Sequence, residues 1–109
     1  MRKVISSLAI IAIILSFVSC SSDNDAEAYN NRAVAKERTG DYKDAIADYD
    51  KAIEINPKFA EAYYNRGIAK ESTGDYKGAI ADWGKAIELN PSLKDKLQPR
   101  IDSAREKLK

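Results

Sequence analysis

AEAYYNRGIAKESTGDYKGAIADWGKAIELNPSL, residues 60–93, decides the fold, because residues 26–59 repeat it with few changes. When the two 34-residue units are aligned, 24 positions are identical and ten differ. Self-similarity at a period of about 20 to 50 residues indicates a stacked array, in which each unit buries its apolar face against its neighbour. The sequence therefore predicts a repeat protein, and the surfaces of such arrays usually bind rather than catalyse.

Each unit contains two segments with helical spacing. Apolar or small residues recur every three or four positions, which predicts amphipathic helices. In residues 26–59 the first segment has them at Tyr29, Ala33 and Val34, and the second at Tyr42, Ala45, Ile46, Tyr49, Ala52 and Ile53. We therefore expect one helical hairpin per unit.

Breaks in the helical pattern fall at equivalent places in both units. Thr39-Gly40-Asp41 and Thr73-Gly74-Asp75 separate the two helices of each hairpin. Glycine accepts the positive φ that ends a helix, and the carboxylate after it can cap the next helix. Asn56-Pro57 and Asn90-Pro91 end each second helix, because proline disfavours the helical conformation in the residue before it.

The units resemble the tetratricopeptide repeat at its small and aromatic positions. These positions hold Tyr63, Gly67, Tyr76, Ala79, Trp83, Ala86 and Pro91 in the second unit, and Tyr29, Ala33, Tyr42, Ala45, Tyr49, Ala52 and Pro57 in the first. Small residues let paired helices approach to about 8 to 10 Å, and the aromatic rings fill the space beside them. The resemblance implies an all-α fold, a short α-solenoid with helix-turn-helix hairpins at residues 26–59 and 60–93.

Some charged residues and glycines depart from the family pattern. Arg32 and Arg66 stand where leucine is usual, and Lys36 and Lys70 where an aromatic residue is usual. We interpret these residues as packing variants whose aliphatic stems cover apolar surface while their charges reach water. Glycine also stands inside the second predicted helix of the second unit, at Gly78 and Gly84. We interpret these glycines as tolerated drift on the outer face.

Residues 94–109 carry a single apolar stripe among charged side chains. The stripe consists of Leu97, Ile101, Ala104 and Leu108. Their spacing predicts an amphipathic helix that caps the last hairpin with a polar outer face. Because Pro99 would break a helix interior, we expect the helix to begin near Gln98. Two repeats and a cap bury a small core, which also allows a homo-oligomer.

Residues 1–19 have the pattern of an export signal. Met1, Arg2 and Lys3 form a basic start, and residues 4–18 are mostly apolar and carry no charge. A helix that spans a bilayer needs about 20 apolar residues, so this run is short for a permanent anchor. We therefore predict a signal peptide, with an uncleaved anchor as the alternative.

Cys20 directly follows this segment. Val18-Ser19-Cys20 resembles the lipobox of bacterial lipoproteins, although Phe17 replaces the usual leucine. The resemblance implies cleavage before Cys20 and lipidation of its thiol, with acyl chains such as palmitate. Residues 20–25 then form the lipidated cysteine and a short polar tether, and Ser21 favours sorting to the outer membrane. We expect an exported protein that is lipid-anchored to the bacterial membrane.

The composition argues against several kinds of site. The chain has no histidine and one cysteine, which removes the metal sites and nucleophile–base pairs built from these residues. Without Arg2 and Lys3, 16 basic side chains stand against 17 acidic ones, so the sequence offers no electrostatic footprint for nucleic acid. The acids Asp41, Asp44, Asp48 and Asp50 are interpreted as N-caps and solvated helix faces. We expect no catalytic residue, cofactor or metal site.

The family resemblance also implies a concave groove lined by the first helix of each repeat. The facing positions give six candidate partner-binding residues, Asn30, Asn31, Val34, Tyr64, Asn65 and Ile68. The same face includes Glu27, Glu37, Arg38, Glu61, Glu71 and Ser72. Asparagine amides can bond the backbone of an extended peptide, and Tyr64, Ile68 and Val34 offer an apolar floor. We expect the groove to bind an unidentified envelope protein or peptide.

One specialisation of the family is not expected here. The carboxylate clamp for peptide C-termini uses five positions, which in this chain hold Asn30, Val34, Asn65, Asp95 and Pro99. Only Asn65 fits fully, and no pair of cations remains to bind a carboxylate. The sequence therefore favours a membrane-tethered adaptor for protein–protein interaction. The alternatives are a self-associating structural module and an enzyme or small-ligand binder.

Overall fold

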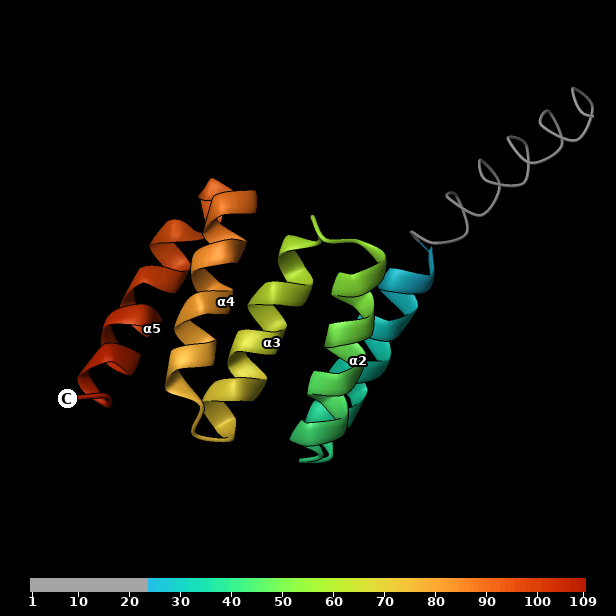
Figure 1. Ribbon diagram of the computed structural model, residues 1–109, viewed down its shortest axis with the longest axis horizontal. Helices are drawn as coiled ribbons and strands as arrows, with labels where there is room; N and C mark the ends of the chain where they lie inside the picture. The colour runs from blue at the N-terminus through green and yellow to red at the C-terminus, as the bar shows by residue number, and fades with distance from the viewer. Residues whose placement is uncertain (1–23) are drawn as a thin grey trace, which may run out of the picture.

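The computed structural model describes residues 24–109, and this part of the chain folds into helices without a strand. The first helix covers residues 24–38. It is followed by α2 (Tyr42–Ile55), α3 (Ala60–Ser72), α4 (Tyr76–Leu89), a 3₁₀ turn (Pro91–Leu93) and α5 (Lys94–Glu106). The helices stand side by side in a row and alternate in direction (Figure 1). The predicted all-α fold, two helical hairpins and a C-terminal capping helix, is confirmed.

The predicted N-terminal features fall mostly outside the described residues. The signal peptide at 1–19 and Cys20 lie outside residues 24–109, whereas Asn24 and Asp25, expected in the polar tether, are helical. Within residues 24–109 no helix is both long and apolar enough to cross a membrane.

The turn inside each hairpin depends on a glycine. Gly40 and Gly74 have φ angles of 82° and 86°, a left-handed conformation that glycine adopts without steric cost. Before the two Asn-Pro pairs, α2 and α4 end at Ile55 and Leu89. The turns inside the hairpins and the ends of α2 and α4 were therefore predicted correctly.

The predicted aspartate caps differ between the hairpins. The Asp75 carboxylate accepts a hydrogen bond from the Gly78 amide at 3.0 Å, whereas the Asp41 side chain caps no amide of α2. A Cβ atom at position 78 would collide with the Asp75 carboxylate, and the first hairpin carries Asp44 at that position. The expectation of a cap at Asp41 is therefore wrong. A residue with a side chain at position 78 would require the Asp75 carboxylate to shift, and the interpretation of Gly78 as tolerated drift stays a prediction.

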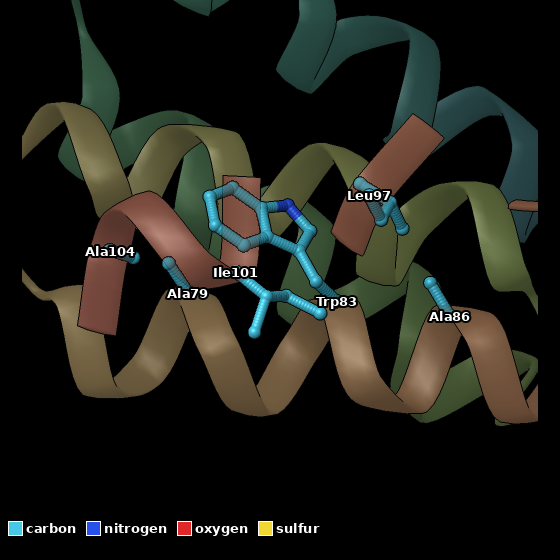
Figure 2. Packing of buried hydrophobic residues seen from close by; sticks show 6 residues of the cluster. All are labelled: Ala79, Trp83, Ala86, Leu97, Ile101 and Ala104. Atoms are coloured by element: carbon cyan, nitrogen blue, oxygen red, sulfur yellow. The ribbon is translucent and has the colours of Figure 1, made fainter. Parts of the chain in front are cut away.

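Two groups of buried side chains form the core. Alanines bring the helices together, and one fully buried aromatic ring per hairpin, Tyr49 or Trp83, fills the space between them. The first group is Ala33, Ala45, Tyr49 and Ala69. The second is Ala79, Trp83, Ala86, Leu97, Ile101 and Ala104, from α4 and α5 (Figure 2). Because Ala69 lies on α3, the first group joins the two repeats, and the second joins the last repeat to its cap.

The capping helix begins earlier than expected. It starts at Lys94 and contains Pro99 in its interior, so the prediction of a start near Gln98 is wrong. Proline removes the hydrogen bond to the carbonyl four residues earlier, at Asp95. Both Asp95 and Pro99 are exposed, so water can bond the freed carbonyl.

The apolar stripe of the capping helix is buried over three of its four residues. Leu97, Ile101 and Ala104 are at most 4% exposed, whereas Leu108 is 46% exposed. The helix ends at Glu106, so Leu108 no longer follows the helical face, and its predicted burial is wrong.

Trp83 fits the core because residue 67 has no side chain. A Cβ atom on Gly67 would overlap the indole ring, and the indole Nε1 donates a hydrogen bond to the Tyr64 carbonyl oxygen at 3.2 Å. In the first hairpin the equivalent pair is Ala33 and Tyr49, in which a smaller ring leaves room for a methyl group. The differences Ala33/Gly67 and Tyr49/Trp83 therefore form a linked exchange, because the larger ring requires the smaller residue opposite it.

Gly67→Ala is expected to destabilise the protein by about 1 to 3 kcal/mol, because the added methyl group overpacks against Trp83. The sign is informative, since alanine in a helix interior is otherwise about 1 kcal/mol more favourable than glycine. Gly84→Ala is the matched control and should stabilise, because a Cβ atom there meets open space. Urea unfolding followed by circular dichroism measures both changes.

Adding Trp83→Tyr to Gly67→Ala recreates the pair of the first hairpin. The double variant should therefore lose less stability than the sum of the two single variants. Additive losses in the same unfolding measurement would contradict the linked exchange.

Candidate functional site

A pocket of about 330 Å³ lies where α3, the end of α4 and the start of α5 meet. Its lining consists of Ala60, Glu61, Tyr64, Asn65, Asn90, Leu93 and Lys96. Glu61, Tyr64 and Asn65 belong to the face that was predicted to line a groove. Asn90, Leu93 and Lys96 were not predicted, because they lie after α4 or on α5 rather than on the first helix of a repeat.

The pocket combines a cation, an aromatic ring and two amide side chains. The Lys96 Nζ atom lies 4.9 Å from the centre of the Tyr64 ring, within range of a cation–π interaction. The Tyr64 main chain is held by the hydrogen bond from the Trp83 indole, so this wall of the pocket is tied to the core. Glu61 is exposed and adds the opposite charge. These groups suit a ligand with both polar and apolar parts.

A second asparagine holds Asn65 in place. The Asn65 Nδ2 atom donates a hydrogen bond to Asn30 Oδ1 at 3.3 Å, across the boundary between the repeats. Asn30 is only 2% exposed. Asn30 therefore positions Asn65 and is not itself open to a partner.

The other predicted groove residues do not line the pocket. Asn31 is exposed on the first helix. Val34 is half-buried and packs against the first core group, and Ile68 is half-buried and packs against the second. Of the six candidates, the structure brings Tyr64 and Asn65 together in the pocket.

A buried aspartate joins the two helices of the first hairpin. Asp48 is 4% exposed and accepts hydrogen bonds from Arg32 Nε and Nη2 at 2.8 and 2.7 Å. The Lys36 Nζ atom lies 2.9 Å from the same carboxylate. Because an unpaired buried charge is costly, this aspartate needs its basic partners. The interpretation of Asp48 as part of a solvated face is therefore wrong, and Arg32 and Lys36 are ion-pair partners.

The second hairpin repeats this arrangement and extends it. Arg66 donates to Asp82 at 2.8 and 2.7 Å, and Lys70 Nζ lies 3.2 Å from Asp82. Arg66 Nη1 also donates to Asp50 in α2 at 2.8 Å, so one guanidinium joins α2, α3 and α4. The reading of Arg66 and Lys70 as simple packing variants is corrected in the same way. The constant spacing of 16 residues between arginine and aspartate was the available sequence signal.

The contacts shift the ionisation of several groups. The hydrogen bond from Arg32 holds the pKa of Asp48 below its ordinary value, against the opposing effect of burial. Burial raises the pKa of Glu37, although the Tyr49 hydroxyl donates a hydrogen bond to it at 2.6 Å. The bond to Asp82 raises the pKa of Arg66, which keeps the guanidinium charged. These shifts lie in the hairpin interior and away from the pocket lining.

Across residues 24–109 no three histidine, cysteine or carboxylate side chains gather in a position to hold a metal ion. The chemistry that the pocket offers is non-covalent recognition through amides, a ring and an ammonium group.

Comparison with known families decides the nature of the repeats. Residues 37–74 match a family model described as a TPR repeat, and residues 60–93 match the model of the tetratricopeptide repeat. The chain is built from tetratricopeptide repeats. No match was found among curated proteins.

Solved structures share the tetratricopeptide fold. The first TPR of Spaghetti (RPAP3) bound to HSP90 peptide SRMEEVD has a TM-score of 0.72 and 24% identity, over 76% of this chain and 65% of that one. Two crystal structures of MamA have TM-scores of 0.71 and 0.72 and identities of 32% and 31%, over 75% and 83% of this chain. They are covered over 47% and 48% of their own length. The chain thus spans less than two thirds of each structure.

Asp82→Asn is expected to cost about 3 to 5 kcal/mol of folding stability, because it breaks a buried ion pair and leaves the Arg66 side chain, only 16% exposed, beside a neutral partner. Asp48→Asn should cost less, since the Arg32 side chain is 59% exposed and can turn toward water. Asp44→Asn, on the exposed face of α2, is the control and should change stability by less than about 0.5 kcal/mol. Denaturant unfolding at pH 7 measures the free energy of unfolding of the three variants and so gives the order of their stability losses. An Asp82 variant as stable as the Asp44 variant would contradict it.

The ion pair of Asp48 also predicts a dependence on pH. Its pKa is lower in the folded chain than the ordinary value of about 3.9. The pair therefore stabilises the fold above that pH, and its contribution is lost as the pH falls through the folded pKa. The difference in unfolding free energy between the wild type and Asp48→Asn should shrink between about pH 4 and pH 2. A difference that stays constant over this range would exclude the pair as its cause.

Proposed function

We propose that this protein is a membrane-tethered adaptor of the bacterial cell envelope, which holds a partner protein or peptide on the face that includes α3. The observation that carries the proposal is the pocket beside Tyr64 and Lys96, which opens among residues that the repeat pattern assigns to recognition. Protein–protein interaction is the usual task of tetratricopeptide arrays. The pocket supports the proposal that this interaction takes place beside Tyr64.

The pocket suits a peptide segment that presents an apolar side chain beside its main chain. Its volume of about 330 Å³ lies at the small end of ligand sites, enough for a large side chain. Leu93 and the Tyr64 ring would contact that side chain, and the Asn65 amide would bond the peptide backbone. Asn31 and Val34 on the neighbouring helix would extend the contact.

The partner is not expected to be held by a C-terminal carboxylate. In the RPAP3 structure the bound HSP90 peptide is SRMEEVD, and that likeness concerns the fold. Here the pocket holds one cation, Lys96, and one acid, Glu61. A neutral balance of this kind favours an internal segment or a folded surface over a free carboxylate.

The tether rests on the predicted lipidation of Cys20. The N-terminal ends of the first helix, α3 and α5 lie at the same edge of the row (Figure 1), and the pocket is lined by the first turns of α3 and α5. From Cys20 to Asn24 the chain can extend by at most about 14 Å. A lipid at Cys20 would therefore keep this edge beside the bilayer. Export and Ser21 together favour the outer membrane.

A photo-cross-linking side chain at position 96 is expected to capture the partner in growing cells, because Lys96 lines the pocket. The same group at position 54, exposed on α2, is the control and should capture nothing. Adding Tyr64→Ala and Asn65→Ala should remove the cross-link, while circular dichroism shows unchanged helicity. Cross-links that are as strong from position 54, or that survive the two alanine changes, would place the binding site elsewhere.

The intact mass of the N-terminus tests the tether separately. Protein from fractionated cells is expected to begin at Cys20 with added acyl mass, and Cys20→Ser should lose both the added mass and the membrane association. A product that keeps residues 1–19 would indicate an uncleaved anchor. An unacylated product without them would indicate a soluble exported protein.

A further inference from the structure

The first helix presents one face that no other described helix covers. Asp25, Ala28, Tyr29 and Arg32 follow one another at spacings of three, one and three residues, which places them on one stripe of the helix. They line a hollow of about 160 Å³. The Arg32 guanidinium lies 5.0 Å from the centre of the Tyr29 ring, so its position on this stripe is fixed by the ring and by Asp48.

The second repeat shows what this face does when a helix covers it. Ala62 and Ala69 on α3 are fully buried, because α2 packs against them. Their equivalents on the first helix, Ala28 and Ala35, are exposed. The face is therefore a packing surface, with small residues that allow another helix to approach to about 8 to 10 Å.

Arg32 on the first helix is also more exposed than Arg66, its equivalent on α3. Arg66 is 16% exposed in its side chain, and its Nη1 donates to Asp50 on α2. The Arg32 side chain is 59% exposed, and among residues 24–109 its hydrogen bonds go to Asp48 alone. A carboxylate supplied from outside would complete the arrangement seen at Arg66.

We propose that a second copy of this chain supplies that carboxylate, in a two-fold dimer of antiparallel first helices. The stripe begins with Asp25 and ends with Arg32, seven residues or about 10 Å further along the helix. A two-fold axis between residues 28 and 29 brings Asp25 opposite the partner's Arg32 and Arg32 opposite the partner's Asp25. The same axis sets Ala28 against the partner's Tyr29, so the contact is complementary in charge and in size. Self-complementarity of this kind is what an isologous interface requires.

The C-terminal end of the row, formed by α5, has no self-complementary face of this kind among the described residues. At the C-terminal end the charged side chains pair with one another, Asp102 with Arg105 inside α5 and Glu106 with Lys109 just beyond it, and a polar outer face is what ends an array. The first helix instead exposes alanines beside an acid and a base. The dimer does not involve the pocket beside Tyr64, so it is independent of the proposed partner site.

Sedimentation of the protein made from its full sequence tests the dimer, in mild detergent and with a reducing agent that prevents a disulfide at Cys20. A dimer whose fraction grows with concentration is expected. Asp25→Lys, which sets like charges against each other, and Ala28→Arg, which blocks close approach, should each raise the dimer dissociation constant at least about tenfold. Asp95→Lys makes the same charge change in the first turn of α5 and should leave the constant unchanged.

A mixture of two charge variants gives the sharper test. Asp25→Lys alone and Arg32→Glu alone each place like charges opposite one another twice, so both should be monomeric. Mixed together, they place opposite charges at both contacts and should form a heterodimer. Circular dichroism checks that Arg32→Glu folds, and if it does not, Asp25→Lys and Ala28→Arg still decide the matter. A wild type that is monomeric at all concentrations, a dimer that survives Asp25→Lys and Ala28→Arg, or an equal loss in Asp95→Lys would overturn the proposal.

Discussion

The Arg66 guanidinium is the contact on which the arrangement of the helices depends, because it joins three of them. It pairs with the buried carboxylate of Asp82 on α4 and with Asp50 on α2. A buried carboxylate that loses its partner is costly, so α3 cannot slide along either neighbour without a large penalty. Tyr64 and Asn65 lie directly before Arg66 on the same helix, and the pocket that they line inherits this fixed position.

The two repeats are nearly identical in sequence, and their differences specialise the second one. Trp83 is larger than Tyr49, requires Gly67 opposite it, and bonds the main chain of Tyr64. The tyrosine at position 64 replaces Asn30 of the first repeat, which is buried. The pocket therefore exists in the second repeat because its core and its surface changed together. It is completed by Asn90 and Leu93 after α4 and by Lys96 of α5, whose counterpart 34 residues earlier is the buried Ala62.

The fold could be predicted from the sequence because every signal occurred twice, as with Gly40 and Gly74. Asn90, Leu93 and Lys96 of the pocket could not be predicted, since they reach Tyr64 only through the packing of α5 and of the turn before it. The ion pairs were missed because an aspartate on a helix looks solvated until the arginine 16 residues earlier is known to face it. Pro99 misled the prediction of α5 because an exposed carbonyl can bond water in place of the lost amide.

The proposed lipid tether and the proposed dimer, taken together, would restrict how the array can lie on a membrane. The first helix covers residues 24–38, a rise of about 21 Å from end to end. If antiparallel first helices stood upright, one of the two copies would hold its residue 24 about 21 Å above the bilayer. The four residue steps from Cys20 span at most about 14 Å, which is too short. Both lipids can insert when the helices lie parallel to the bilayer and the two-fold axis stands perpendicular to it. In that orientation the two pockets, which lie beside the N-terminal ends of α3 and α5, would fall at opposite edges of the dimer, so one partner would not obstruct the other.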